Sequence, residues 1–598
     1  MAASEPRSLL ETLARGALGA VLLVAATLCA YAPALHGEFV WDDDVIVLLN
    51  RTLRSADGLR RIWLEPGAVL QYYPLVHTSY WLEYHAWGRE PFGYHLVNVL
   101  LHAVNAVLVW RLLRRLAVPG AFAAAAIFAL HPVHVESVAW ISERKNVLSG
   151  AFYLAAILAY LRFRPLDASP PSRPVAWYAC ATALFVCSLL SKTVTLTLPV
   201  AILILVWWKR GRVERRDVGA LIPLVLVAIP LGLVTVWAEK RFVGATGQDW
   251  SLSLVDRLLI AGRAPWFYAG KLAWPRTLAF MYPRWDLDAS VWWQSLLPFT
   301  VLAVLCAAWL LRRRLGRSPL AALLFFVGTL VPALGFFDVY PMRYSFVADH
   351  FQYLASLGLI ALAIGAMTHA LMRRGPAALA IGRAAAVVLV LVLGVLTWRQ
   401  SHIYHDAETL WRNTVTSSPT SWMAHNNLGL LLAAKGRPAD AVPEYTEALR
   451  IRPGMPEVLD NLGNALAAVG RRDEAIRQYE ESLRVRPGSP LVHSNLAVVL
   501  AGAGRLADAE AHYREALRQK SDYVVAMVNL GVLLQGQGRL DEAISLFGEA
   551  LRLQPDSADA HHNLAVVLAA TGHQAEARAQ MAEAQRLRAS PESAYRPR

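Results

Sequence analysis

The sequence is short of charged residues and of cysteine, and both shortages restrict the kind of protein it can be. Only 17% of its 598 residues are charged, while 56% are hydrophobic. This balance is too apolar for an ordinary soluble multidomain protein. The four cysteines, Cys29, Cys180, Cys187 and Cys306, all lie inside apolar stretches. They indicate neither a disulfide framework nor a metal site, so we expect a chain that lipid solvates over much of its length.

The basic residues lie in short clusters between apolar runs. The net charge is +13, and Lys209–Arg216 and Arg312–Arg317 are two of the clusters that carry it. Clusters of this kind are typical of membrane-protein loops that face the cytoplasm. We therefore predict a lipid bilayer, and no nucleic acid, as a partner.

Eleven apolar runs have about the length that a helix needs to cross a bilayer. They cover residues 17–35, 94–113, 119–138, 147–163, 175–190, 193–208, 218–238, 291–311, 319–337, 352–372 and 380–398. A twelfth stretch, 254–275, contains Arg257, Arg263 and Lys271. Each charge at the bilayer centre would cost about 2.5 to 3.5 kcal/mol. We interpret this stretch as an interfacial or re-entrant element.

Eleven spans that start from a cytoplasmic N-terminus place the basic clusters consistently on the inside. The same parity places everything after Trp398 on the outer side, together with the loops 36–93, 139–146, 239–290 and 338–351. Residues 30–32 (Ala-Tyr-Ala) resemble a signal-peptidase site, and cleavage there would leave the orientation of the later spans unchanged.

The last third of the sequence repeats with a period of 34 residues. The repeated positions include Asn427, Asn461, Asn495, Asn529 and Asn563, and also Gly436, Gly470, Gly504, Gly538 and Gly572. This period and its small residues are typical of tetratricopeptide repeats, which are stacked helix pairs. We expect Tyr445, Tyr479, Tyr513 and Phe547 to fill the space between the layers. The repeats predict a protein or peptide partner.

Candidate chemistry lies in the outer loops, and the most acidic of these contains Asp42, Asp43 and Asp44. Neighbouring carboxylates repel one another and raise at least one pKa, which suits a general base or a cation site. A solvated loop, or an aspartate that caps a helix, would give the same pattern.

Histidines gather at the outer ends of the second and third apolar runs. His95 and His102 alternate with two asparagines on one face of the second run, where they predict either interhelical hydrogen bonds or a polar cavity. His131, His134 and Glu136 follow the third run. They lack the further ligands at zinc-like spacing that a metal site needs, and we predict no metal.

Cations reach the same outer face from three further places in the sequence. They are Arg144, Lys192 and Arg343, and His350 follows them in the last outer loop. Cations and carboxylates at one membrane surface favour a site for a phosphate-bearing lipid.

Three motifs together with the repeats resemble the transmembrane and tetratricopeptide repeat-containing mannosyltransferases and their bacterial relatives. The motifs are residues 39–44 (FVWDDD), 131–142 (HPVHVESVAWIS) and 348–358 (ADHFQYLASLG). The resemblance implies a glycosyltransferase of the GT-C class. Such an enzyme would transfer a mannose-like sugar from a polyprenyl phosphate to Ser or Thr hydroxyls on the non-cytoplasmic side, which here implies the periplasmic side of a bacterial inner membrane.

The resemblance also implies roles for particular residues. The paired acidic motif falls on Asp42 and Asp43 as the catalytic carboxylates, and the basic residue after Trp-Ile-Ser falls on Arg144. Arg144, Lys192 and Arg343 are the candidates for holding the donor phosphate. Asp44, His95, His102, His131, His134, Glu136 and His350 are candidates for supporting the cavity.

These inferences combine into one hypothesis with two alternatives. We expect an all-α protein with a transmembrane GT-C-like domain over residues 1–400, a tetratricopeptide solenoid over 401–588 and a disordered tail over 589–598. A carboxylate takes the proton of an acceptor hydroxyl, and cations stabilise the departing lipid phosphate without a cofactor. The alternatives are a non-enzymatic membrane scaffold and a polymerase or ligase of surface polysaccharide.

Overall fold

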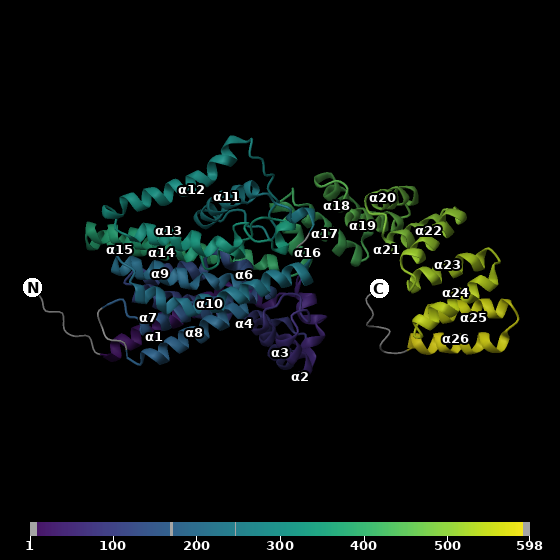
Figure 1. The fold of residues 1–598 in the computed structure, drawn as a ribbon, viewed down its shortest axis with the longest axis horizontal. Helices are drawn as coiled ribbons and strands as arrows, with labels where there is room; N and C mark the ends of the chain where they lie inside the picture. Colours follow the sequence, from purple (N-terminus) through teal and green to yellow (C-terminus); the bar gives the residue numbers. More distant parts are fainter. Residues whose placement is uncertain (1–8, 168–171, 245–246, 590–598) are drawn as a thin grey trace, which may run out of the picture. The chain divides into compact units, whose positions relative to one another are not determined.

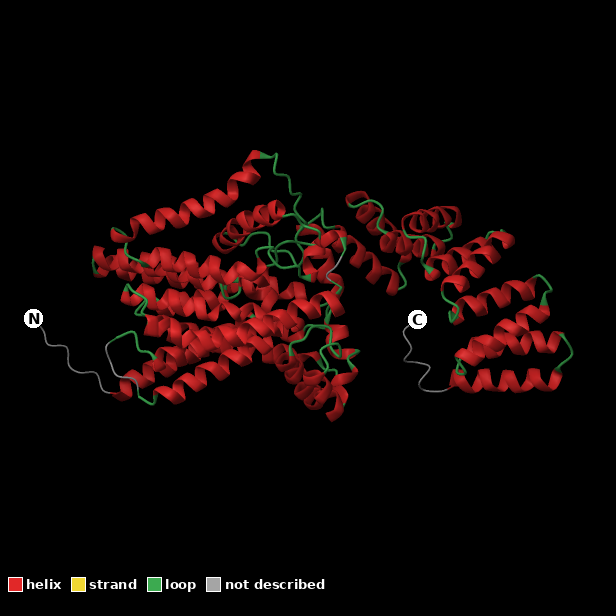
Figure 2. Ribbon diagram, in the orientation of Figure 1, coloured by secondary structure: helices red, strands yellow, loops and turns green. Residues whose placement is uncertain are grey.

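The computed structural model describes residues 9–167, 172–244 and 247–589, and it divides the chain into two compact units, 1–419 and 420–598. The described residues form helices and loops and contain no strand (Figure 2). The predicted tail begins at residue 589, and residues 590–598 of it lie outside the described part of the chain. The all-α prediction is confirmed for the part that is described.

The first unit is a bundle of helices of very different lengths (Figure 1). Its helices are α1 (Leu9–Ala30), α2 (Ala56–Leu64), α3 (Pro74–Trp87), α4 (Pro91–Arg115), α5 (Ala121–Leu130), α6 (Val135–Ala139), α7 (Arg144–Phe163), α8 (Pro174–Ser191), α9 (Leu198–Arg210), α10 (Arg215–Ala238), α11 (Leu254–Ala273), α12 (Trp292–Leu310), α13 (Ser318–Leu330), α14 (Ser356–Arg374), α15 (Pro376–Ser401) and α16 (Ala407–Ser417).

Each of the eleven predicted apolar runs falls on a helix or a helix pair. Within the described residues, eight helical segments are long and apolar enough to cross a membrane, and a bent pair brings the number to nine. The two remaining runs fall on shorter apolar helices, Gly16–Ala30 and Ser318–Ala333. The multispan helix bundle is confirmed, and the count of eleven spans stays a prediction.

The bent pair differs from the single run expected over 119–138. Helix α5 and the helical segment Pro132–Ala139, which ends in α6, meet at an angle of 52°. The proline causes the break, because it cannot donate the backbone hydrogen bond that a continuous helix needs and because it disfavours helical geometry at the residue before it. The break places the His-Pro-Val-His segment in a buried turn.

The four loops predicted on the outer side meet at one end of the bundle. Asp43 of the first loop accepts a 2.8 Å hydrogen bond from the backbone N–H of Ser142 in the second. The side-chain amide of Gln71 in the first loop donates a 3.0 Å hydrogen bond to Glu239 of the third. The backbone N–H of Tyr340 in the last loop donates to the same carboxylate at 3.3 Å. The loops predicted on one side of the membrane therefore lie together in the structure.

The loops predicted on the inner side meet at the opposite end. Arg164 and Arg210 both pair with Asp217, at 3.0 and 3.1 Å. Trp208 donates a 2.9 Å hydrogen bond to Ser318. The bundle thus has an acidic-loop end, near the start of α4, and a basic-loop end, near the finish of α4.

Helix α11, which covers most of the doubtful stretch 254–275, begins and ends at the acidic-loop end. Near its start, Arg257 pairs with Asp338 at 2.7 Å. Near its finish, the carbonyl of Leu272 lies 2.8 Å from Nε2 of His131. Both partners belong to the acidic-loop end, so these contacts support the interpretation of this stretch as an interfacial or re-entrant element.

The chain leaves the bundle beside the acidic loop. The backbone N–H of Glu38 donates a 2.8 Å hydrogen bond to the carbonyl of His405, and the Trp41 ring packs against Trp411 of α16 with centroids 4.7 Å apart. Because α16 packs on the bundle in this way, the two units divide after Pro419, later than the boundary expected after residue 400.

The second unit is an array of paired helices. They are α17 (Trp422–Ala434), α18 (Pro438–Ile451), α19 (Pro456–Ala468), α20 (Arg472–Val485), α21 (Pro490–Gly502), α22 (Leu506–Gln519), α23 (Val524–Gly536), α24 (Leu540–Leu553), α25 (Ala558–Ala570) and α26 (Gln574–Ala589). Each turn within a pair contains a glycine with positive φ, from 73° at Gly436 to 87° at Gly572. Such a φ favours glycine because it has no Cβ.

The predicted large residues fill the space between the paired helices. Tyr445, Tyr479, Tyr513 and Phe547 are all buried. A Cβ added to Gly463 would lie 2.6 Å from the Tyr479 ring. The glycine of the first helix therefore makes room for the aromatic ring of the second helix. The predicted repeat packing is confirmed.

The parity of the spans predicts where a reporter protein will be active. A periplasm-active phosphatase fused after Ser401 or after Arg588 should be active in a bacterial inner membrane, because both points follow eleven predicted crossings. The same reporter fused after Arg115, at the basic-loop end, should be inactive. Phosphatase activity after Arg115, or its absence after Ser401, would contradict the predicted topology.

Candidate active site

The acidic loop is held by the side chain of Asp43. One carboxylate oxygen accepts the backbone N–H and the hydroxyl of Ser142, and the other accepts the backbone N–H of Val40 at 3.0 Å. Asp43 is fully buried, and burial raises its pKa to about 7. Both of its oxygens are therefore engaged in joining the first outer loop to the second.

The backbone of this loop is strained at Trp41, whose φ is 51°. This left-handed conformation costs a residue with a side chain about 1 to 3 kcal/mol. Aromatic packing offsets that cost: the Trp41 ring contacts Trp140, Phe280 and Trp411, with centroids 6.5, 5.3 and 4.7 Å away. The strained residue comes directly before Asp42 and fixes the course of the chain there.

Asp42 differs from both of its acidic neighbours. Asp42 is partly exposed to solvent, whereas Asp43 is buried. Asp44 is exposed at the start of the turn Asp44–Leu48. Its removal from water raises the pKa of Asp42 to about 6, and the nearby positive charge of Lys145 opposes that rise. A carboxylate with a pKa close to neutral is suited to accepting a proton.

Glu143 is the centre of a buried polar cluster near this carboxylate. One of its oxygens lies 2.9 Å from the ammonium of Lys145 and the other 3.3 Å from that of Lys192. Asn146 donates to Glu143 at 2.6 Å and accepts from Lys192 at 2.7 Å. We call Glu143, Lys145, Asn146 and Lys192 the lysine cluster.

The last outer loop joins the lysine cluster through His350. Its Nδ1 lies 2.9 Å from Glu136, its backbone N–H donates to the same carboxylate at 3.0 Å, and its Nε2 lies 3.7 Å from Glu143. Next to it, Asp349 is buried and accepts a 3.0 Å hydrogen bond from Tyr282, and its burial raises the pKa of Asp349 well above the ordinary value. The motif over 131–142 and the motif over 348–358 thus meet in space.

Arg144 lies in a different place from the one its predicted role requires. Its side chain is 0% exposed and forms a bidentate ion pair with Glu83 of α3. The guanidinium also donates to Asn98, to Ser79 at 3.1 Å and to the carbonyl of Tyr94 at 2.8 Å. All of its donors are directed at the protein, so the geometry supports an anchoring role instead of phosphate binding.

Two of the remaining histidines link helices to one another. His102 contacts the hydroxyl of Tyr353 at 2.7 Å and the carbonyl of Ala129 at 3.0 Å, and His134 contacts Ser356 at 3.0 Å. His95 is buried beside Gly37. Of the two interpretations given for His95 and His102, the contacts of His102 support interhelical hydrogen bonding.

The structure brings together some of the predicted site residues and separates others. Asp42, Lys192, Glu136 and His350 lie on or around the lysine cluster, whereas Arg343 pairs with Asp249 at 3.5 Å. The prediction from sequence did not include Glu143, Lys145 or Gln71, whose amide accepts from Lys145 at 3.2 Å. For Glu143 and Lys145 the sequence does contain a signal, which is the charged run Glu143-Arg144-Lys145 at the start of an apolar helix.

Comparison with known proteins supports the resemblance that the motifs indicated. A protein O-mannosyl-transferase of Caenorhabditis elegans is 25% identical over 73% of this chain and 63% of its own length. Protein O-mannosyl-transferase TMTC1 of Homo sapiens is 26% identical over 73% of this chain and 55% of its own length. The chain is thus similar to these two protein O-mannosyl-transferases over 73% of its length.

A Drosophila melanogaster protein O-mannosyl-transferase shares 38% identity over a shorter stretch, which covers 22% of this chain and 17% of the relative. The chain therefore spans less than two thirds of the length of each of these three mannosyl-transferases. Tetratricopeptide repeat family models match residues 419–488, 461–524 and 522–590. The repeat prediction is confirmed by both the family models and the helix pairs.

Two solved structures are similar to part of this chain. The tetratricopeptide protein YrrB is 21% identical, with a TM-score of 0.26, over 31% of this chain and 96% of its own. MamA of Desulfovibrio magneticus is 20% identical, with a TM-score of 0.26, over 29% of this chain and 97% of its own.

The buried ion pair of Arg144 predicts a loss of stability when it is broken. Replacing Arg144 by Gln should lower the free energy of unfolding by about 3 to 5 kcal/mol, because the carboxylate of Glu83 then stays buried without its partner. Thermal unfolding in detergent micelles measures this change.

The double variant Glu83→Gln with Arg144→Gln should recover part of the loss, because it leaves no unpaired buried charge. Arg115→Gln, at the exposed end of α4, serves as the control and should unfold like the unchanged protein. An Arg144→Gln variant as stable as the control would contradict the anchoring role.

Proposed function

We propose that this protein transfers a mannose-like sugar from a polyprenyl phosphate to a Ser or Thr hydroxyl of a protein on the non-cytoplasmic side of the membrane. The observation that carries the proposal is the partly covered carboxylate of Asp42 beside the lysine cluster. The sequence relation to protein O-mannosyl-transferases supports the chemical class.

Asp42 acts as the general base in this proposal. The acceptor oxygen attacks the anomeric carbon, its proton passes to the Asp42 carboxylate, and the bond from the anomeric carbon to the phosphate oxygen breaks. The lipid phosphate leaves with the electron pair of that bond. Asp43 serves in positioning, because both of its oxygens already accept hydrogen bonds from the protein.

The lysines are suited to stabilising the charge that builds on the leaving phosphate. An ammonium has three donors, and in the contacts described here Lys145 uses two, on Glu143 and Gln71. Lys192 likewise uses two, on Glu143 and Asn146. Each therefore has a third donor for a phosphate oxygen, and Lys145 takes the role that sequence had given to Arg144.

The repeats bind the acceptor protein or peptide in this proposal. The chain passes directly from α16, which packs on the acidic loop through Trp411, into the first repeat helix. A polypeptide held by the repeats is then tethered to the same chain as the base. The tether raises the effective concentration of the acceptor at Asp42.

Removing the base should abolish most of the activity. Asp42→Asn keeps the shape of the side chain but cannot accept the proton, so we expect the rate to fall by about 10² to 10⁴. The assay is reconstituted protein with polyprenyl-phosphate mannose and envelope proteins, read by mass spectrometry of Ser and Thr glycosylation.

The adjacent Asp44→Asn is the matched control and should stay close to full activity, because Asp44 is exposed. Full activity of Asp42→Asn would contradict the proposed base. Changed polysaccharide with unmodified proteins would favour the polymerase alternative.

The rate should depend on pH through Asp42. Its pKa is raised to about 6, and only the deprotonated carboxylate accepts a proton, so the rate should rise with pH through a midpoint near 6. Lys145 lowers the pKa of Asp42. The variant Lys145→Gln should therefore move the midpoint to higher pH, whatever its effect on the maximal rate.

The control is Arg51→Gln, which removes an exposed cation from the same loop and should leave the midpoint in place. A midpoint that Lys145→Gln does not move would argue against Asp42 as the titrating group.

A further inference from the structure

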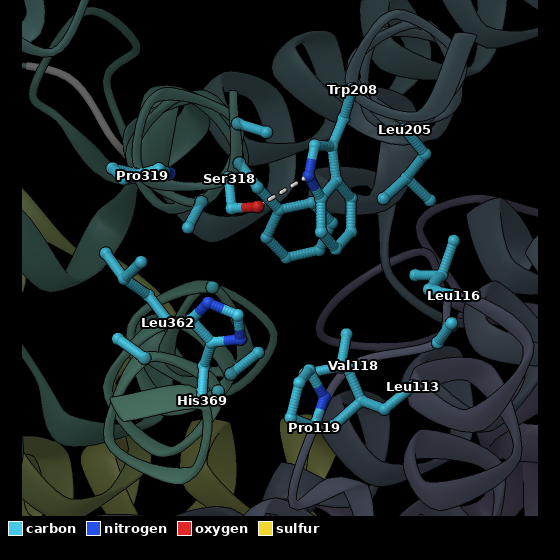
Figure 3. Close-up of a pocket in the computed structure, with 18 of the residues that line it drawn as sticks. Leu113, Leu116, Val118, Pro119, Leu205, Trp208, Ser318, Pro319, Leu362 and His369 are labelled. Atoms are coloured by element: carbon cyan, nitrogen blue, oxygen red, sulfur yellow. Dashed lines mark hydrogen bonds between the residues drawn. The ribbon is translucent and has the colours of Figure 1, made fainter. Parts of the chain in front are cut away.

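A cavity lies at the basic-loop end of the bundle, away from the candidate active site. It has a volume of about 480 Å³ and lies between α4, α9, α13 and α14 (Figure 3). Leu113 of α4 lines it, whereas Asn98 of the same helix contacts Arg144 at the acidic-loop end. At a rise of 1.5 Å per residue these two positions are about 22 Å apart. The mechanism proposed above does not use this cavity.

The walls of the cavity are mostly apolar. Leu113, Leu116, Leu205, Phe325 and Leu362 contribute to them from four helices and the turn after α4. Trp208 and His369 enter the space from opposite sides in Figure 3, and the Trp208 indole donates a 2.9 Å hydrogen bond to Ser318. An apolar interior of this kind suits hydrocarbon.

One border of the cavity is basic. Lys209 and Arg373 line it, and no carboxylate occurs among the described residues that do so. The Lys209 ammonium lies 4.0 Å from the centroid of the Trp208 ring, which holds it at the edge of the apolar space. The border therefore complements a negative charge.

The cavity is also long. Its lining follows α14 from Leu357 to Arg373, a distance of about 24 Å at 1.5 Å per residue. The lining therefore extends from the basic border along most of α14, a helix that is apolar enough to cross a membrane. A molecule with one charged end and a long hydrocarbon chain would match both the border and the interior.

We propose that this cavity binds an anionic phospholipid. The phosphate lies against Lys209 and Arg373, and an acyl chain lies along α14 between α4 and α13. Basic pockets between membrane helices at a cytoplasmic surface are suited to anionic headgroups, and this end of the bundle carries the basic clusters. Phosphatidylglycerol is the probe for the proposal, with phosphatidylcholine as the zwitterionic comparison.

Native mass spectrometry of the delipidated full chain tests the proposal. At equal concentrations, phosphatidylglycerol should bind at least fivefold more than phosphatidylcholine. The double variant Lys209→Gln with Arg373→Gln should weaken phosphatidylglycerol binding by about tenfold, because two headgroup contacts are lost. Arg374→Gln, exposed on the same helix but outside the cavity lining, should bind like the unchanged protein.

A second pair of variants tests the hydrocarbon part of the cavity. Ala366 lines the cavity, whereas Ala363, on the same helix, is exposed and lies outside the lining. Ala366→Phe should fill the space and abolish specific phosphatidylglycerol binding, while Ala363→Phe should leave it unchanged. If Ala366→Phe does not fold, as judged by helix content, Ala370→Phe replaces it, since Ala370 also lines the cavity.

Two results would overturn the proposal. Equal binding of the two lipids would show that the basic border does not select a headgroup. Phosphatidylglycerol binding that survives both the folded filling variant and the charge-removing variant would place the lipid elsewhere on the bundle.

Discussion

The candidate site depends on the burial of one carboxylate, that of Glu143, among cations at the end of a membrane bundle. An unpaired charge in such a place would cost several kcal/mol, so the lysines and the asparagine that contact Glu143 are required partners of its negative charge. The reverse also holds, because Lys145 of α7 and Lys192, which directly follows α8, could not be held close together without a shared anion. Glu143 is therefore what makes a concentrated positive site possible there.

The same constraint explains why neighbouring residues have opposite roles. Arg144 stands between Glu143 and Lys145 at the first turn of α7, where successive side chains point in different directions. It therefore faces away from the lysine cluster, into a pocket formed by Glu83, Asn98 and Ser79. Its five donors form a rigid fork that matches a carboxylate, which makes it a suitable anchor between α3, α4 and α7.

The sequence allowed the fold to be predicted well because its signals are local. Apolar length, basic clusters and a period of 34 residues are all properties of short windows, and each predicted run falls on a helix or a helix pair. The bend at Pro132 and the packing of α16 on Trp41 were harder to predict. The first needs the identity of one residue inside an apolar run, and the second depends on contacts between residues more than 360 positions apart.

The site was predictable at the level of residue types and loops, but not at the level of roles. Asp42, Lys192, Glu136 and His350 were recognised as chemically unusual at a membrane surface, and they do lie around one cluster. Spacing could not show that Asp43 uses both oxygens on the backbone or that Arg144 has Glu83 as a partner. Such roles follow from long-range contacts, which a single sequence does not contain.

The aromatic cluster around Trp41 joins the parts of the molecule that the proposed reaction needs. Trp41 precedes the proposed base, Phe280 belongs to the loop that follows α11, and Trp411 belongs to the helix that leads into the repeats. Aromatic rings in edge contact hold their relative orientation well, so these three segments constrain one another. A change at Trp411 can therefore reach Asp42 through a strained backbone at Trp41. This path is a physical connection between the helix that precedes the repeats and the chemistry proposed for the membrane domain.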